Sequence, residues 1–223
     1  NQKYRGATEQ VGTLKQQVLV VVTLLFGYWF AMTLLPVPDS LGGPGANLIN
    51  APSRTLAAWT DRFLLGGHLW VSSKTWDPEG PLSTIPAIGT AMLGVFAGRW
   101  IGERRPIEER LNGLFAGGAL AMMAGLMWHW SFPINKSLWT SSYVLFTAGM
   151  ACVAIGTIMW IIDLKKVTWW TRPFVIYGVN PIIAFVGSGM MARLIYSLWK
   201  VGVDGKPTAI QAVVYQNVFA SWL

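Results

Sequence analysis

The sequence predicts an all-α integral membrane protein, a polytopic helix bundle with five transmembrane helices and a long structured loop on the periplasmic side. Two features of the composition carry this prediction. Only 12% of the 223 residues are charged, about half of the share found in soluble domains, and the mean hydropathy is +0.43. These values disfavour a soluble single-domain enzyme. The one cysteine, Cys152, excludes an intrachain disulfide scaffold.

Five apolar segments are long enough to cross a bilayer as helices, which takes about 20 residues. The expected helices cover residues 18–35, 82–101, 111–128, 143–162 and 174–194, and none contains aspartate, glutamate or lysine. The tryptophans that lie at or just beyond the expected helix ends are Trp100, Trp128, Trp130, Trp139, Trp160, Trp169, Trp170 and Trp199. Because indole rings prefer the headgroup level, these positions independently indicate the membrane boundaries.

The basic residues lie in alternating connections, and this pattern predicts the orientation. One side holds the N-terminal flank and two connections, whose cations are Lys3, Arg5, Lys15, Arg99, Arg104, Arg105, Arg110, Lys165, Lys166 and Arg172. We expect this side to be the cytoplasmic face of a bacterial inner membrane, with the N-terminal flank of this fragment in the cytoplasm. The net charge of +7 is then a topology signal, and nucleic acid is not an expected partner.

The remaining segments complete a single membrane domain over residues 1–223, which we expect to be a piece of a longer protein. Residues 36–81 form the outer loop. Ile210, Val214 and Val218 recur at four-residue spacing and predict an interfacial helix over residues 208–222. The expected partners are the lipid bilayer and either a second copy or a larger membrane complex.

Small residues four positions apart allow two membrane helices to approach closely. The glycines with this spacing, and those that extend the same face, are Gly94, Gly98, Gly113, Gly117, Gly118 and Gly125. They predict a compact bundle packed within the chain.

Asn180 and Pro181 lie inside the fifth expected helix. Proline bends a helix, and a polar amide in a span faces the interior of a bundle. Asn180 therefore either joins a kinked helix to its neighbour or lines a polar cavity.

The outer loop carries polar side chains beside tryptophans, a combination suited to a carbohydrate-like ligand. The polar residues are Asp61, Arg62, His68, Asp77 and Glu79, and the rings are Trp59, Trp70 and Trp76. Long loops in compact domains are often functional. Each polar group also has a structural alternative, because all five can cap, bridge or complement the dipole of a short interfacial helix or of the second span.

Most catalytic templates are absent from the sequence. His68 and His129 are the only histidines, and because neither has a cysteine or carboxylate at ligand spacing, no metal site is expected. Phosphate-binding loops, the hydrolase nucleophile elbow and the dinucleotide fingerprint have no match. Cys152 lies mid-span among apolar neighbours, where we expect an inert thiol.

Five inner cations could contact a nucleotide phosphate or a lipid headgroup. They are Arg104, Arg105, Lys165, Lys166 and Arg172. Ordinary positive-inside anchoring explains the same residues.

Four strings follow one another along the chain: WTDRFLLGGHLW, WDPEGPLSTIPAIGTAMLGVFAGRW, FPINKSLWTSSYVLFTAG and IIDLKKVTWWTRPFVIYGVNPIIAFVGSG. In this order they resemble the C-terminal half of the heparan-alpha-glucosaminide N-acetyltransferase family, including its bacterial members. The resemblance runs from Leu56 to Trp222, and DPEG followed by NKxLWT is its most specific part.

The resemblance implies a membrane acyltransferase that moves an acetyl group from cytosolic acetyl-CoA to an amino sugar or related acceptor on the periplasmic side. Acetyl-CoA is then a co-substrate, and no permanently bound cofactor is expected. The residues that fall on acceptor-side motif positions are Asp61, Arg62, His68, Asp77, Glu79, Asn135, Lys136 and Trp139. The family's active-site histidine belongs to an outer loop that nothing in this chain matches, so its role is not transferred to His68 or His129.

Acyl transfer needs a base for the attacking amine and a donor for the developing oxyanion. Within this chain we expect His68 or Asp77 as the base and Asn180 or Lys136 as the donor. Two alternatives stay open. One is a non-catalytic accessory or scaffold subunit that keeps the acyltransferase fold in a larger membrane complex. The other is a transporter of acyl or sugar groups, suggested by the interruption at Asn180 and Pro181.

Overall fold

The computed structural model describes residues 13–38, 49–203 and 206–220. The chain divides into two compact units, Asn1–Lys165 and Lys166–Leu223, and each is described by itself. Lys3, Arg5 and Trp222, which entered the expectations above, lie outside the described residues.

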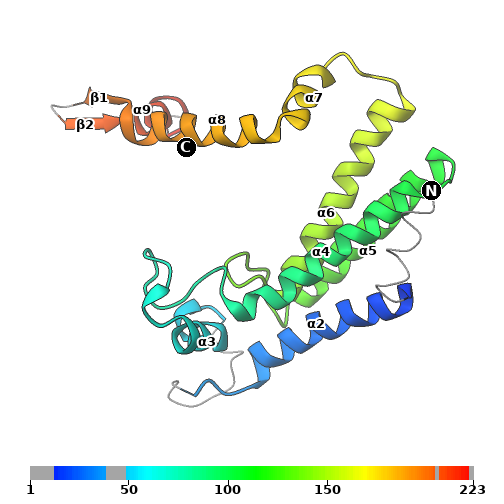
Figure 1. Ribbon diagram of the computed structural model, residues 1–223, viewed down its shortest axis with the longest axis horizontal. Coiled ribbons are helices and arrows are strands. Elements are labelled where there is room, and N and C mark those ends of the chain that lie inside the picture. The colour runs from blue at the N-terminus through cyan, green and yellow to red at the C-terminus, as the bar shows by residue number, and fades with distance from the viewer. Residues whose placement is uncertain (1–12, 39–48, 204–205, 221–223) are drawn as a thin grey trace. The chain divides into compact units, whose positions relative to one another are not determined.

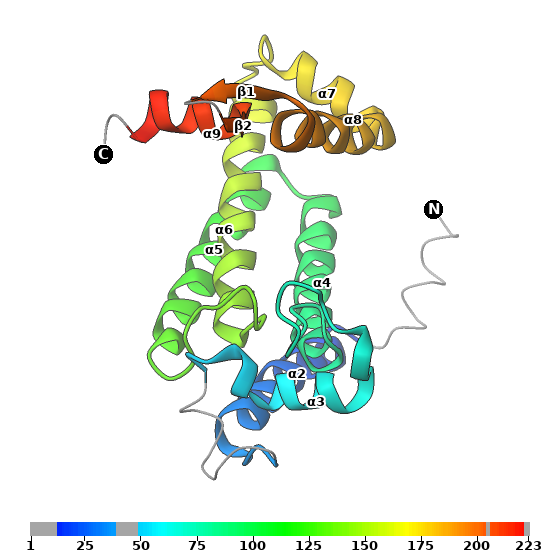
Figure 2. The same cartoon turned by 90° about the vertical axis from the view of Figure 1, so that its left-hand side faces the viewer.

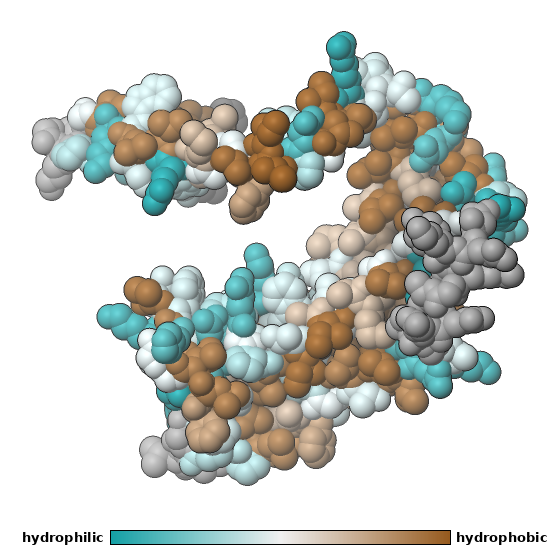
Figure 3. Space-filling model, in the orientation of Figure 1, coloured by the Kyte–Doolittle hydropathy of each residue, from teal (hydrophilic) through white to brown (hydrophobic). Residues whose placement is uncertain are grey.

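Four long helices build the first unit (Figure 1). They are α2 (Leu14–Leu34), α4 (Pro81–Gly102), α5 (Ile107–His129) and α6 (Ser141–Met159), and a π-helical turn over Trp160–Leu164 continues the last of them. These four, and Pro181–Leu198 in the second unit, are long and apolar enough to cross a membrane. Hydrophobic side chains accordingly cover much of the visible surface of the helices (Figure 3). The fold class is confirmed, and the chain is a multi-pass membrane protein.

Local signals set the starts of these helices earlier than hydropathy alone predicts. Thr13 caps α2, because its Oγ1 accepts a hydrogen bond from the Gln16 amide at 3.4 Å. Pro81 occupies the first turn of α4, where a missing N–H has no consequence. Pro106 directly precedes α5, which begins at residue 107 rather than 111. Polar first turns suit these helix starts, because the first N–H groups of a helix have no intrahelical partner and are satisfied by side chains or water.

A short helix, α3 (Leu56–Leu65), lies in the outer loop between two 3₁₀ turns, Pro52–Arg54 and Gly66–His68. Thr55 caps it, with Oγ1 accepting from the Ala58 amide at 3.2 Å, and Gly66 ends it with a φ of 53°. Helix α3 is seen almost end-on in Figure 1, and its axis runs across that of α4 in Figure 2. It therefore covers one end of the bundle without extending it.

Glycines bring α5 and α6 into backbone contact. A Cβ added to Gly149 would lie 2.5 Å from the Gly118 carbonyl oxygen, and one added to Gly125 would lie 2.6 Å from the Phe146 nitrogen. Gly118 and Gly125 thus pack as predicted. Gly94, Gly98 and Gly117 do not, since a Cβ on any of them would meet nothing within 4 Å, and Gly113 faces the Trp100 ring instead. The spacing of the glycines predicts a helix face of small residues, but it does not predict which neighbouring helix packs against that face.

Two apolar clusters hold the unit together. One lies at the outer end and contains Tyr28, Met32, Ile49, Ala57, Phe132 and Leu138. The other lies farther along α2 and contains Val21, Leu25 and Val144, with half-buried side chains of α4 packed around them. Both clusters join segments that are more than 100 residues apart in sequence.

The second unit differs from the expected pair of helices. The fifth predicted helix, 174–194, is two helices, α7 (Thr171–Val179) and α8 (Pro181–Arg193), followed by a π-helical turn over Leu194–Leu198. Pro181 has no N–H to continue α7, so it starts α8 instead.

The expected interfacial helix over 208–222 is also shorter than predicted. Strands β1 (Lys200–Val203) and β2 (Lys206–Ala209) form an antiparallel hairpin with Lys200 opposite Ala209. Helix α9 (Ile210–Val214) and a π-helical turn over Tyr215–Phe219 follow. Valine and threonine favour the extended conformation, which explains why Val201 and Thr208 pair in the hairpin.

Gly149→Ala is expected to lower the free energy of unfolding by about 1–3 kcal/mol, the usual cost of overpacking a close contact. Its Cβ would collide with the Gly118 carbonyl of α5. Gly94→Ala is the matched control, because it adds the same methyl group to a span position with open space around it. Thermal unfolding in detergent, followed by tryptophan fluorescence, measures both variants. Equal midpoints for the two variants would contradict the glycine-mediated contact.

Candidate functional site

The end of the first unit that holds α3 collects all eight of the predicted acceptor-side residues. We call this region the outer cap, and it consists of α3, residues 66–80 and the α5–α6 loop of residues 130–140. The chain enters it at the end of α2 and again at the end of α5, and leaves it at the starts of α4 and α6. Figure 2 shows these helix ends gathered at one end of the unit.

Asp61 lies at the centre of the outer cap, on the inward face of α3. Its side chain is fully buried, and Oδ2 accepts a hydrogen bond from the Asp77 amide at 2.9 Å. Oδ1 has no partner and lies against Gly80, where a Cβ would collide with it. Burial raises the pKa of Asp61 and the nearby Asp77 carboxylate adds to this, while the hydrogen bond from the Asp77 amide and the Arg62 charge lower it. The net shift is upward.

The segment from Asp77 to Gly80 forms a hydrogen-bonded turn that begins α4. The Asp77 side chain accepts from the Glu79 amide at 2.9 Å, and the Gly80 amide donates to the Asp77 carbonyl at 3.1 Å. Ser83 ties the turn to the helix, because its Oγ donates to the Pro78 and Gly80 carbonyls. Asp77 is half-buried and Glu79 is exposed. The turn therefore presents the exposed Glu79 carboxylate and the partly engaged Asp77 carboxylate at the surface of the cap.

Arg62 binds two backbone carbonyl groups, one on each side of α3 in the sequence. Its Nη1 donates to the Ser53 carbonyl at 2.9 Å and to the Thr75 carbonyl at 3.0 Å. The guanidinium thus joins the segment before α3 to the segment before the Asp77 turn. Of the two alternatives for Asp61 and Arg62, these contacts favour the structural one.

The two histidines have opposite hydrogen-bond roles. His68 is exposed in the 3₁₀ turn after α3, and its Nδ1 lies 3.2 Å from the Leu65 carbonyl oxygen. A carbonyl oxygen can only accept, so Nδ1 carries the proton and the lone pair of Nε2 is directed elsewhere. His129 instead accepts at Nδ1 from the Ile134 amide at 2.9 Å. The ring of His129 therefore closes the α5–α6 loop, while His68 retains a basic nitrogen.

The α5–α6 loop is ordered by Asn135 and by hydroxyl groups. The Asn135 side chain accepts from the Ser137 and Leu138 amides, and its own amide donates to Thr140 Oγ1 at 3.0 Å. Trp139 adopts a φ of 51° and donates from Nε1 to Thr90 of α4 at 3.1 Å. Lys136 is exposed. Three of the predicted acceptor-side groups are thus brought together, but only Lys136 faces outward.

Sequence reasoning missed the buried hydroxyl groups of this end. Thr140, Ser141 and Ser142 are fully buried, and Ser141 Oγ donates to the Leu25 carbonyl of α2 at 2.7 Å. Three consecutive hydroxyl residues before an apolar run are a helix-start signal that could have indicated them.

The predicted inner cations differ in their contacts and are divided between the two units. Arg105 is paired with Glu103 at 2.5 Å and Glu109 at 3.4 Å, and lies over the Trp100 ring. Arg104 is exposed and has no ion pair within the described part of the first unit. Lys165 lies over the Trp160 ring, while Lys166 and Arg172 belong to the second unit.

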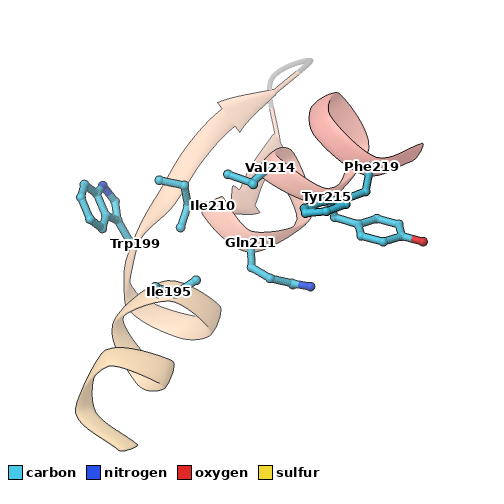
Figure 4. A pocket seen from close by; sticks show the side chains of 7 residues that line it. All are labelled: Ile195, Trp199, Ile210, Gln211, Val214, Tyr215 and Phe219. Carbon is cyan, nitrogen blue, oxygen red and sulfur yellow. The ribbon is translucent and has the colours of Figure 1, made fainter. Parts of the chain in front are cut away.

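Two cavities of the second unit are lined by described residues. One, of about 580 Å³, is lined partly by Asn180, whose Nδ2 donates to the Ile176 carbonyl of α7 at 2.9 Å. The other, of about 440 Å³, has an almost wholly apolar lining (Figure 4). Trp199 and Ile195 approach it from one side and Val214 and Phe219 from the other. Asn180 is thus both bonded to its own helical segment and part of a cavity wall.

Among the described residues, no group of three or more histidine, cysteine, aspartate or glutamate side chains could hold a metal ion. The side chains that the outer cap offers for chemistry include the His68 imidazole, the Asp77 and Glu79 carboxylates and the ammonium groups of Lys74 and Lys136.

Asp61→Asn is expected to remove a pH dependence of stability. A buried carboxyl whose pKa is raised on folding stabilises the protein below its unfolded pKa, about 4, and that contribution is lost as pH rises through the folded value. The thermal midpoint of the wild type should therefore fall relative to the variant as pH rises from about 4. Asparagine keeps an oxygen for the Asp77 amide. Parallel midpoint-against-pH curves for the two proteins would show that Asp61 does not titrate in this way.

No protein family model matches the chain. Two curated proteins are similar to it, both described as heparan-alpha-glucosaminide N-acetyltransferase. The mouse protein is 31% identical over 209 residues, which covers 82% of this chain and 32% of the mouse protein. The human protein is 29% identical over 206 residues, which covers 81% of this chain and 31% of the human protein.

The chain spans about a third of the length of these curated relatives. The similarity nevertheless extends over most of the chain itself, including both units. At the level of a family, the chain resembles heparan-alpha-glucosaminide N-acetyltransferase.

Proposed function

We propose that the chain is part of a membrane acyltransferase that moves an acetyl group from cytosolic acetyl-CoA to the amino group of an amino sugar or related acceptor on the periplasmic side of a bacterial inner membrane. The observation that carries the proposal is the similarity to two N-acetyltransferases over about four-fifths of the chain. The outer cap supports it, because it presents groups that can bind and deprotonate an amine.

The reaction sets the demands on the outer cap. The acceptor nitrogen attacks the thioester carbonyl carbon, a C–N bond forms and the C–S bond breaks. The nitrogen loses a proton to a base, and coenzyme A leaves as a thiolate that takes up a proton. An ammonium group cannot attack, so the base must act on the bound amine.

His68 is the proposed base. Its Nδ1–H is held by the Leu65 carbonyl, and this contact orients Nε2 as the acceptor of a proton. Asp77 is the second candidate, although its carboxylate already accepts the Glu79 amide. Glu79 would attract the protonated amine of the acceptor, and Lys136 would stabilise the oxyanion.

The inner cations would contact the phosphates of acetyl-CoA. Arg104 is the strongest candidate of the first unit, because no acidic group of the described chain is paired with it. Arg105 would have to leave two carboxylates and an aromatic ring before it could bind a phosphate. Binding a phosphate at Arg104 therefore breaks fewer existing contacts than binding one at Arg105.

His68→Gln in the full-length protein is expected to lower kcat for acetyl transfer by about 10²–10⁴-fold, the usual contribution of a general base. His129→Gln is the matched control. It should lower thermal stability, because the Ile134 amide loses its acceptor, and leave kcat per folded molecule unchanged. Transfer from radiolabelled acetyl-CoA to amino-sugar acceptors measures both variants.

A His68→Gln enzyme with wild-type kcat would remove the proposed role of His68. Failure of the intact wild type to acetylate any acceptor, together with stable co-purification of other subunits, would instead favour the accessory-subunit alternative.

Arg104→Gln is expected to raise KM for acetyl-CoA by about 5-fold, the effect of losing one exposed charge contact of about 1 kcal/mol. The difference from wild type should shrink at high salt, because salt screens exposed charges. Arg105→Gln is the comparison, and its KM should change less since that guanidinium is already paired. Equal increases in KM for the two variants would contradict this assignment.

A further inference from the structure

Helix α3 has one buried and one exposed face, and the exposed face is apolar. Ala57, Ala58 and Asp61 are buried against the rest of the unit. Phe63 is 72% exposed and Leu64 is 58% exposed. Trp59 stacks on Phe63 with their ring centroids 5.4 Å apart, so the exposed ring is held in place.

The apolar surface continues beyond the helix. Val71 is 81% exposed and Trp70 is 49% exposed in the segment that follows the 3₁₀ turn. Figure 3 shows hydrophobic side chains over α3 beside hydrophilic ones of the neighbouring loop. Large apolar side chains that gather on one surface mark a site covered by lipid or by another protein.

The position of α3 favours lipid. The helix runs across the bundle axis at the level where α4 begins (Figure 2), and it contacts both α2 and α4. Along α2, Phe26, Phe30 and Leu34 form an exposed stripe at four-residue spacing that ends at this level. The exposed faces of α3 and of this end of α2 are therefore both apolar, as expected for surfaces that meet lipid.

The charges around α3 agree with a headgroup environment. Arg54 and Lys74 are exposed on either side of the helix in sequence, where long cationic side chains reach lipid phosphates. A sugar-binding surface would need polar groups aimed at the ligand beside the ring. The Arg62 guanidinium does not supply them, because it is turned toward the Ser53 and Thr75 carbonyls.

We infer that α3 is an interfacial helix that lies in the plane of the outer leaflet, with Phe63, Leu64 and Val71 inserted at the boundary between headgroups and acyl chains. Such a helix buries its apolar face in lipid and fixes the outer cap at a set depth. Lipid contact would then hold the Asp77 turn, which Asp61 joins to α3, at the membrane surface.

Site-directed spin labelling of the full-length protein tests the inference. Cys152 is the one cysteine of this sequence, so a background without accessible cysteines is labelled at Phe63→Cys, Leu64→Cys or Val71→Cys. Ser72→Cys, an exposed polar neighbour, is the matched control. The protein is placed in vesicles of phosphatidylcholine and phosphatidylglycerol, and variants with the parental thermal midpoint are compared.

Labels at 63, 64 and 71 are expected to collide more often with dissolved oxygen than with a water-soluble nickel chelate, and the label at 72 should show the reverse. Free access of the nickel chelate to positions 63 and 64 would overturn the inference in favour of a water-facing ligand surface. Immobilised labels that neither reagent reaches would overturn it in favour of a protein partner, such as a second copy.

Discussion

The hydrogen bond from Tyr28 to the Leu138 carbonyl is the interaction on which the outer end of the first unit depends. The bond is 2.5 Å long, and both residues are almost completely buried. An unpaired hydroxyl in such surroundings costs about 1–3 kcal/mol. A second bond, from Ser141 to the Leu25 carbonyl, joins the same two parts of the chain. Together they hold α2 against the α5–α6 loop and the first residue of α6. Tyr28 and Leu138 belong to the outer apolar cluster, and Leu25 belongs to the other one.

This arrangement separates the polar groups of the outer cap into two classes. Asp61, Arg62 and Asn135 are used internally, because their partners are backbone groups of the cap. His68, Glu79 and Lys136 keep atoms that face outward, and the Asp77 carboxylate is only partly engaged. The first class fixes the shape of the surface, and only the second can act on a ligand. A motif residue in this region is therefore not a catalytic residue merely because it is polar.

The sequence predicts which segments span the membrane, but it does not predict which helix faces contact one another. Apolar length and the basic connections suffice for α2, α4, α5 and α6, because the bilayer imposes both properties on any helix that crosses it. Gly149 could not be recognised as the partner of Gly118, since contact depends on the rotation of α6 about its axis. The sequence predicts that Asp61 lies on a short helix, but it does not predict that Asp61 lies on the buried face of that helix. The hairpin of β1 and β2 had a local signal, the Asp204-Gly205 pair between two valine- and threonine-containing segments, which the helical spacing of Ile210 and Val214 concealed.

The packing of the first unit also limits where an acyl group could travel under the proposed function. Between α5 and α6 the Gly118 and Gly149 backbones touch, which leaves no room for a thioester. Between α2, α4 and α6 the space is filled by Val21, Leu25 and Val144, with apolar side chains of α4 around them. Between these helices, the described part of the core is therefore filled by packed side chains and backbone. A donor bound on the inner side and an acceptor bound at the outer cap would therefore have to meet at the surface of this unit. The groups that shield the reacting atoms from water there must come from outside this unit.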